Sequence, residues 1–157
     1  MRHLSLLAAS CLWVALAAAP AKTYGDASAS EAAARDVMSA FLEAFNARDE
    51  AAWADTLHFP HVRLASQGVA VYPTREAFIE AMDMQTFAAE HGWTHSTWDA
   101  MRTVQAGADK VHVIVTFSRH RDDGEGGSER YATFDSLYII ERIEGRWGVR
   151  ARSSFAP

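Results

Sequence analysis

The sequence of 157 residues contains a single cysteine, Cys11, which lies within the first apolar run. If that run is removed on export, the mature chain has no thiol, so disulfides, thiolate metal ligands and iron–sulfur clusters are excluded together. The chain also lacks a basic block, because 15 Lys and Arg stand against 20 Asp and Glu and the formal net charge is −5. Since neutralised phosphates supply most of the affinity for nucleic acid, we expect no nucleic-acid partner.

Beyond the N-terminus the sequence has no run of about 20 apolar residues, so we expect no membrane span in the body of the chain. The N-terminus itself has the form of a secretory signal. Met1-Arg2-His3 is a short basic start, and Leu4 to Ala19 is an apolar stretch that ends in small residues. Ala19-Pro20-Ala21 then supplies the small-x-small pattern that signal peptidase cuts.

This pattern predicts a signal peptide over residues 1–21, a flexible leader over 22–29 and one α+β domain over 30–157. The mature protein is then expected in the periplasm or outside the cell, without attachment to a membrane. Two alternatives remain open at this point: the apolar stretch acts as a single anchor helix, or Cys11 carries a lipid.

The periodicity of the mature sequence changes from helical spacing to alternation near Gly92. Before that point it predicts an amphipathic helix over residues 31–45, a short helix capped by Asp49 and a third helix capped by Thr74. A hairpin over residues 58–72 separates the second and third helices. Alternating segments joined by turn sequences then predict four antiparallel strands, over residues 93–105, 110–119, 131–143 and 146–149.

This order predicts an α+β fold in which a strongly curved antiparallel sheet wraps around three N-terminal helices and leaves a concave pocket. It resembles the cone-shaped fold of the nuclear-transport-factor-2-like superfamily, which includes SnoaL-like and ketosteroid-isomerase-like proteins. The likeness covers residues 28–155. Residues 41–53 resemble the first helix, its N-x-x-D break and the second helix, residues 57–68 the next strand, and residues 135–147 the last hairpin with its G-R-W sequence.

The resemblance also implies positions for a catalytic site. Ketosteroid isomerases use a Tyr on the first helix, a carboxylate base on the next strand and a protonated Asp on a late strand. At the first two positions this sequence has Phe41 and Leu64, so the usual isomerase chemistry is not expected. Asp135 lies near the third position on an apolar strand, and we take it as the best acid–base candidate, with His61 as its partner in proton transfer.

A second group of candidate residues consists of His58 and His61, which flank Phe59-Pro60, and Arg63. Because the backbone around Pro60 is expected to be extended and no third ligand is signalled, we expect no metal site there. If Leu64 faces the core, as in the resembled family, His61 and Arg63 face outward toward a dimer interface. A shifted register instead places both His61 and Arg63 in the pocket, where Arg63 would bind a carboxylate bidentately.

We therefore expect an exported homodimer, paired through the outer sheet face, that binds a small apolar or mixed-polarity molecule without a cofactor. Two other functions remain open: a lyase or isomerase that uses Asp135 and His61, and a dimeric accessory interaction domain. Trp98 lies in a segment that suits either a pocket wall for a flat ligand or plain strand packing. The expected ligand-binding residues are Arg63, Trp98, His58, Phe41 and Leu64.

Overall fold

The computed structural model describes residues 27–156, and the predicted signal peptide, Cys11 and most of the predicted leader lie outside the described residues. The first helix, α1 (Ala27–Ala47), already includes residues 27–29, so the end of the segment expected to be a flexible leader is helical. No helix in residues 27–156 combines the length and the apolar character needed to cross a membrane.

Polar caps define the start of the next two helices. Asp49 accepts a hydrogen bond from a backbone N–H in the first turn of α2 (Glu50–Asp55), and Thr74 does the same for α3 (Arg75–Ala81). Each cap satisfies one of the backbone donors that a helix leaves free at its N-terminus. Both capping residues are those that the sequence predicted.

The third predicted helical segment is divided in two. The backbone is extended at Met82, and the Asp83 side chain then caps a separate helix, α4 (Met84–His91), by accepting a hydrogen bond from the Thr86 backbone N–H. Gly92 ends α4 in the left-handed conformation with a φ of 62°, which glycine adopts without a steric penalty. The break between α3 and α4 matters because it borders the cavity described below.

The six strands of residues 27–156 form one sheet in the order β2-β1-β6-β5-β4-β3. Neighbouring strands pair antiparallel throughout β3–β6 and in the β1–β2 hairpin, whereas β1 and β6 pair parallel. The sheet is therefore mixed, which corrects the expectation of a wholly antiparallel one. The strands are β1 (Leu57–Ala65), β2 (Gly68–Tyr72), β3 (Trp93–Ala106), β4 (Lys110–Asp122), β5 (Ser128–Ile143) and β6 (Arg146–Ser154).

The parallel pair follows from the path of the chain. Two helices and four strands separate β1 from β6, which is ample length for the crossover that a parallel pair needs. Alternation within a strand shows which face is buried but does not identify the neighbouring strand. The sequence pattern therefore predicted the strands without predicting this pairing.

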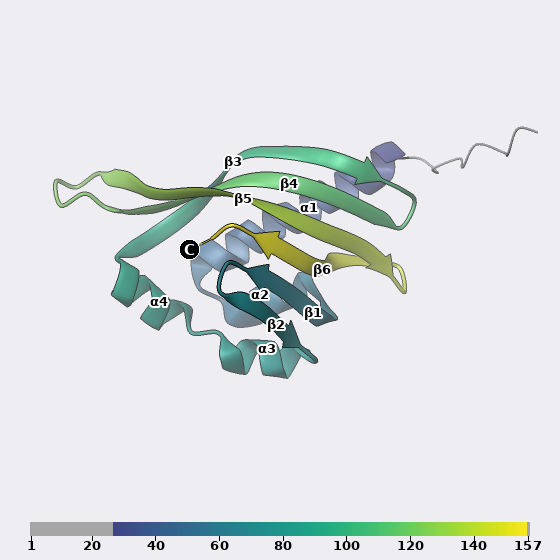
Figure 1. The fold of residues 1–157 in the computed structure, drawn as a ribbon, viewed down its shortest axis with the longest axis horizontal. Helices are drawn as coiled ribbons and strands as arrows, with labels where there is room; N and C mark the ends of the chain where they lie inside the picture. Colours follow the sequence, from purple (N-terminus) through teal and green to yellow (C-terminus); the bar gives the residue numbers. More distant parts are fainter. Residues whose placement is uncertain (1–26, 157) are drawn as a thin grey trace, which may run out of the picture.

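The sheet is curved and not closed, and the helices lie against one of its faces (Figure 1). Along β4, alternate side chains at Val111, Val113, Val115 and Phe117 are buried against that face. An aromatic cluster joins α1, α2 and the sheet, with Phe41 and Phe45 both in edge-to-face contact with Trp53. The expected α+β arrangement, a curved sheet around N-terminal helices, is confirmed.

Candidate functional site

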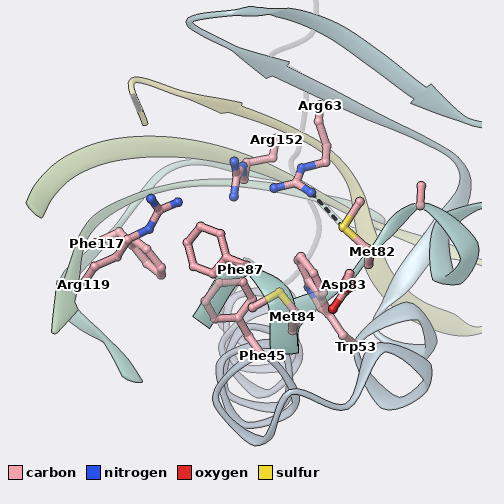
Figure 2. A pocket seen from close by; sticks show the side chains of 11 residues that line it. Phe45, Trp53, Arg63, Met82, Asp83, Met84, Phe87, Phe117, Arg119 and Arg152 are labelled. Carbon is pink, nitrogen blue, oxygen red and sulfur yellow. Dashed lines mark hydrogen bonds between the residues drawn. The ribbon is translucent and has the colours of Figure 1, made fainter. Parts of the chain in front are cut away.

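A cavity of about 230 Å³ lies between the α3–α4 break, the first two helices and the helix-facing side of the sheet. Figure 2 shows its two chemical halves. Exposed Ala81 and Asp83 lie where the cavity meets the surface. The apolar half is lined by Phe45, Trp53, Met82, Met84, Phe87 and Phe117, and the cationic half by Arg63, Arg119 and Arg152.

The cationic half comes from three separate strands. Arg63 on β1 and Arg152 on β6 are direct partners in the parallel register, so their side chains leave the sheet abreast. Arg119 on β4 continues the alternation of the buried residue Phe117 and therefore points to the same face. In Figure 2 the three guanidinium groups point into the same space above the aromatic side chains.

This cationic wall has no acidic counterpart. Among the ion pairs of residues 27–156, none involves Arg63, Arg119 or Arg152. Asp83 borders the cavity, but both its carboxylate oxygens accept hydrogen bonds from Thr86. Asp83 keeps its negative charge at the exposed edge of the cavity, but within residues 27–156 no carboxylate forms an ion pair with any of the three arginines.

Burial and mutual repulsion disfavour the charged form of these arginines, and this lowers the pKa of Arg63 and of Arg119. Burial, together with the positive charge of Arg152, lowers the pKa of Arg63 to about 10. Burial likewise lowers the pKa of Arg119, again with a contribution from Arg152. Arg63 nevertheless remains charged near neutral pH, because a pKa of about 10 is still well above it.

Aromatic rings hold two of the guanidinium groups in place. The guanidinium carbon of Arg63 lies 5.5 Å from the centroid of Trp53, and that of Arg119 lies 4.9 Å from the centroid of Phe87 and 5.2 Å from that of Phe134. These are cation–π distances. An Nη1 hydrogen bond of 3.5 Å to the Met82 sulfur also orients Arg63.

Three buried donors on the cavity wall lack an acceptor within the described residues: Trp53 Nε1, Arg119 Nε and Arg152 Nε. Arg152 is only 8% exposed, so water reaches its side chain poorly. A buried donor without a partner carries a desolvation cost of about 1–3 kcal/mol. All three atoms can only donate, which matches a ligand that accepts hydrogen bonds.

The two buried titratable neighbours of the three arginines, Tyr138 and His61, supply no negative charge. Burial raises the pKa of Tyr138, which lies abreast of Arg152 in the β5–β6 register, so its phenol is neutral. Burial and the charges of Arg63 and Arg152 lower the pKa of His61 to about 4. The His61 ring is 2% exposed, and its Nδ1 hydrogen-bonds to the Val149 carbonyl oxygen at 3.2 Å, which fixes the Nδ1–H tautomer of the neutral ring.

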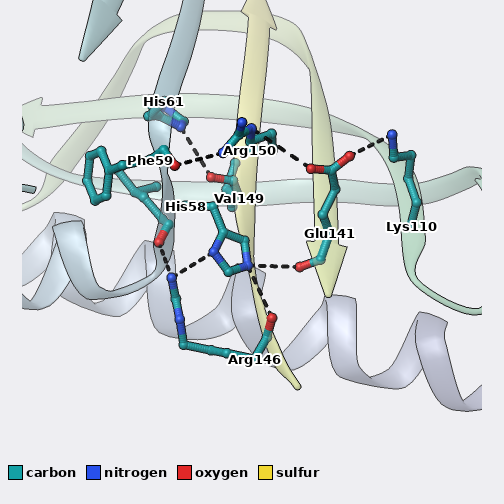
Figure 3. A network of polar contacts seen from close by, with 9 residues as sticks. His58, Phe59, His61, Lys110, Glu141, Arg146, Val149 and Arg150 are labelled. Atoms are coloured by element: carbon teal, nitrogen blue, oxygen red, sulfur yellow. Dashed lines mark hydrogen bonds and ion pairs between the residues drawn. The ribbon is translucent and has the colours of Figure 1, made fainter. Parts of the chain in front are cut away.

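His58 belongs to a separate polar network at the start of β1 (Figure 3). Arg146 donates to His58 Nδ1 at 2.8 Å and to the Leu57 carbonyl oxygen at 2.7 Å, and His58 Nε2 contacts the carbonyl oxygens of Glu141 and Arg146 at 3.1 Å each. Burial, together with the Arg146 charge, lowers the pKa of His58. Both ring nitrogens are therefore occupied by the fold, and His58 does not line the cavity.

The predicted acid–base pair is not brought together. Asp135 is exposed on the other side of β5, between buried Phe134 and Ser136, and it accepts a hydrogen bond of 2.9 Å from Thr116 Oγ1. His61 is buried on the helix side of β1. This placement corrects the expectation that Asp135 lies in the pocket, and the reason is the strict alternation of side chains along a strand.

The remaining predicted ligand-binding residues divide between the cavity and the core. Arg63 lines the cavity, as the shifted register expects, whereas His61 is buried and does not line the cavity. Leu64 is 43% exposed and points away from it. Phe41 is 3% exposed within the aromatic core, and Trp98 packs beside it and donates from Nε1 to the Met38 carbonyl oxygen at 3.2 Å, as expected for plain strand packing.

Sequence patterns did not predict two of the three cationic residues, Arg119 and Arg152, as part of the site. Arg119 carries a readable signal, since it continues the odd-numbered alternation of Val111 to Phe117. Arg152 carries no such signal. A bulge in β6, opposite Ile139 and Ile140, adds one residue just before Arg152 and so interrupts the alternation of buried and exposed side chains along the strand. Residues 27–156 contain no group of three or more His, Cys, Asp or Glu side chains arranged to hold a metal ion.

Comparison with known proteins agrees with the fold. The model of a family described as "NTF2-like protein (DUF6841)" matches residues 30–154. No curated protein matches the sequence.

Solved structures of low sequence identity share the architecture. An NTF2-like protein with a cystatin-like fold from Novosphingobium aromaticivorans has a TM-score of 0.65 at 12% identity, over 80% of each chain. Aln2 from a Streptomyces species has a TM-score of 0.66 at 15% identity, over 81% of this chain and 90% of the other. A protein from Catenulispora acidiphila in complex with S-DNPA has a TM-score of 0.64 at 15% identity, over 82% of this chain and 93% of the other.

Proposed function

The chain belongs to the NTF2-like protein family (DUF6841), and from the cavity that its fold encloses we propose that it binds a small molecule of mixed polarity. The fold by itself does not carry this proposal, because one fold serves many functions. The observation that carries it is the cavity itself, an opening of about 230 Å³ into the core, apolar on one side and rich in hydrogen-bond donors on the other.

The dimensions of the cavity limit the ligand. A volume of about 230 Å³ is below the usual range of roughly 300–1,000 Å³ for drug-sized ligands. It would hold about eight waters, or a compact molecule of roughly ten non-hydrogen atoms. Phe45, Phe87 and Phe117 line the apolar half, and because the Phe45 and Phe117 rings meet edge to face, they offer both a ring face and a ring edge against which an aromatic ligand can pack.

One further observation supports ligand binding, and another supports the location of the protein. A protein of the same fold from Catenulispora acidiphila was solved in complex with S-DNPA, so at least one protein of this fold forms a complex with a ligand. The basic start, apolar stretch and small-x-small site over residues 1–21 support export, which would place the binding protein in the periplasm or outside the cell.

A thermal-shift screen tests the proposal. The mature protein is heated with a panel of small aromatic and aliphatic compounds, each in charged and neutral forms. A compound present at a hundred times its dissociation constant adds about 2.7 kcal/mol to the free energy of unfolding, which raises Tm by roughly 10 °C in a domain of this size. We expect at least one compound of about ten heavy atoms to give such a shift.

A matched pair of variants locates the binding. Ala81→Trp places an indole at the exposed edge of the cavity, whereas Ala89→Trp places one on the exposed surface of α4 away from it. The shift is expected to disappear in the first variant and to persist in the second. If no compound stabilises the wild type, or if Ala81→Trp leaves the shifts unchanged, the cavity is not a binding site.

A further inference from the structure

We propose that the ligand is a small aromatic oxyanion whose negatively charged group is held by Arg63, Arg152 and Arg119. This inference rests on the proposed function and adds the chemical class of the ligand. It is carried by the juxtaposition of three guanidinium groups from three strands on one wall of the cavity, opposite an aromatic surface.

Charge balance is the first reason. Buried or partly buried cations in proteins are normally paired with a carboxylate, since desolvating an unpaired charge is costly. Here three cations share one cavity, and the described residues supply no ion pair to Arg63, Arg119 or Arg152. A ligand oxyanion would supply the missing charge and relieve the repulsion between Arg63 and Arg152.

The second reason is the set of free donors. Arg152 lines the cavity and is more than nine-tenths buried, and its Nε has no acceptor among the described residues; Arg119, which also lines the cavity, has an Nε in the same state. Guanidinium groups present paired donors in one plane, which match the oxygens of a carboxylate or a phosphate. A neutral ligand with one acceptor would leave most of these donors without a partner.

The third reason concerns the body of the ligand. Trp53 and Phe87 already lie under Arg63 and Arg119 at cation–π distances, so the cationic and aromatic halves of the cavity meet directly. A molecule whose charged group is attached to a flat ring fills both halves at once. Inorganic ions satisfy only the cationic half.

Four probes test the inference by calorimetry: benzoate, its neutral isostere benzamide, phenyl phosphate and, as an anion without a ring, inorganic phosphate. Charge-assisted hydrogen bonds make the expected difference large, so benzoate or phenyl phosphate should bind about ten- to a hundred-fold more tightly than benzamide. Whichever of the two aromatic anions binds more tightly identifies the oxyanion as carboxylate or phosphate. Inorganic phosphate should bind more weakly than both.

Variants assign the effect to the arginines. Arg63→Met and Arg152→Met should each remove most of the preference for benzoate over benzamide, whereas Arg35→Met, which changes an exposed arginine on α1, should retain it. Arg63→Lys keeps the charge but loses the paired donors, so its preference should fall between wild type and Arg63→Met. If a methionine variant does not fold, the comparison of benzoate with benzamide on the wild type still decides the question.

The possible outcomes separate the two proposals. Equal affinities for benzoate and benzamide, both abolished by Ala81→Trp, would overturn the oxyanion inference and leave the binding function in place. Inorganic phosphate binding as tightly as the aromatic anions would overturn the aromatic part of the inference. If neither these probes nor any compound of the screen binds in the cavity, the binding function fails and this inference fails with it.

Discussion

His61 makes the stability of the protein depend on pH in a direction that can be calculated. The ring is 2% exposed and lies near the charges of Arg63 and Arg152, and its pKa falls from the ordinary 6.5 to about 4. Between these values the unfolded chain binds a proton at this position and the folded chain does not. Stability from His61 is therefore complete above about pH 6.5 and is lost as the pH falls toward 4.

The two pKa values give the magnitude. A histidine whose pKa falls from 6.5 to about 4 on folding contributes roughly 3 kcal/mol in total, of which about 2 kcal/mol is lost between about pH 7 and pH 5. The pKa of His58 is also lowered by burial, so it adds a smaller loss of the same sign.

Urea unfolding at a series of pH values measures this loss, and the control variants isolate it. His61→Gln removes the titrating ring and retains a donor for the Val149 carbonyl oxygen, so the loss between about pH 7 and pH 5 should shrink by roughly 2 kcal/mol. His91→Gln, at the exposed end of α4, should keep the wild-type pH dependence. A wild-type slope in His61→Gln, or a His61 ring signal that titrates near 6.5 by NMR, would refute the reasoning.

Three further substitutions have expected outcomes. Arg63→Met should raise the ligand-free stability by about 1 kcal/mol in a circular dichroism melt, because it removes a charge that lacks a carboxylate partner, and a clear loss of stability would contradict this. Asn46→Ala should cost about 2 kcal/mol in urea unfolding, since Asn46 exchanges hydrogen bonds of 2.8 Å and 3.0 Å with the Ser96 backbone; the exposed control Ser39→Ala should cost little. Asp135→Asn should leave every calorimetric affinity of the cavity unchanged, and a weakened ligand would show that this exposed carboxylate acts on the site.

Local sequence signals predicted most of the helices and strands because they depend on nearby residues. Asp49 and Thr74 cap α2 and α3 through hydrogen bonds to backbone groups three residues away. Alternation from Val111 to Phe117 marks the buried face of β4. These features are encoded within a few residues, so no knowledge of distant neighbours is needed.

The site was harder to predict because it depends on registers between distant strands. The β1–β6 register shifts between Leu57 and Val62, and this irregularity accompanies the burial of both His58 and His61, which lie three residues apart. The same parallel pairing sets Arg63 beside Arg152. A pattern within one strand cannot reveal either feature, which explains why Arg152 was missed.

His58 shows a further limit of sequence reasoning. Its ring packs so closely on β6 that a Cβ added at Gly148 would lie 3.0 Å from His58 Cδ2. Both nitrogens of the ring are used by Arg146 and by backbone carbonyl oxygens. A histidine with this role looks the same in the sequence as a ligand-binding one, because its partners lie more than 80 residues away.

A crystal structure of the mature protein with para-iodobenzoate tests the central claim most directly, because the anomalous signal of iodine marks where the molecule binds and which way it points. We predict the molecule in the cavity, with its carboxylate facing Arg63 and Arg152 and its iodinated ring on the Phe45–Phe87 side. An empty cavity, or a molecule whose carboxylate turns away from all three arginines, would contradict the claim.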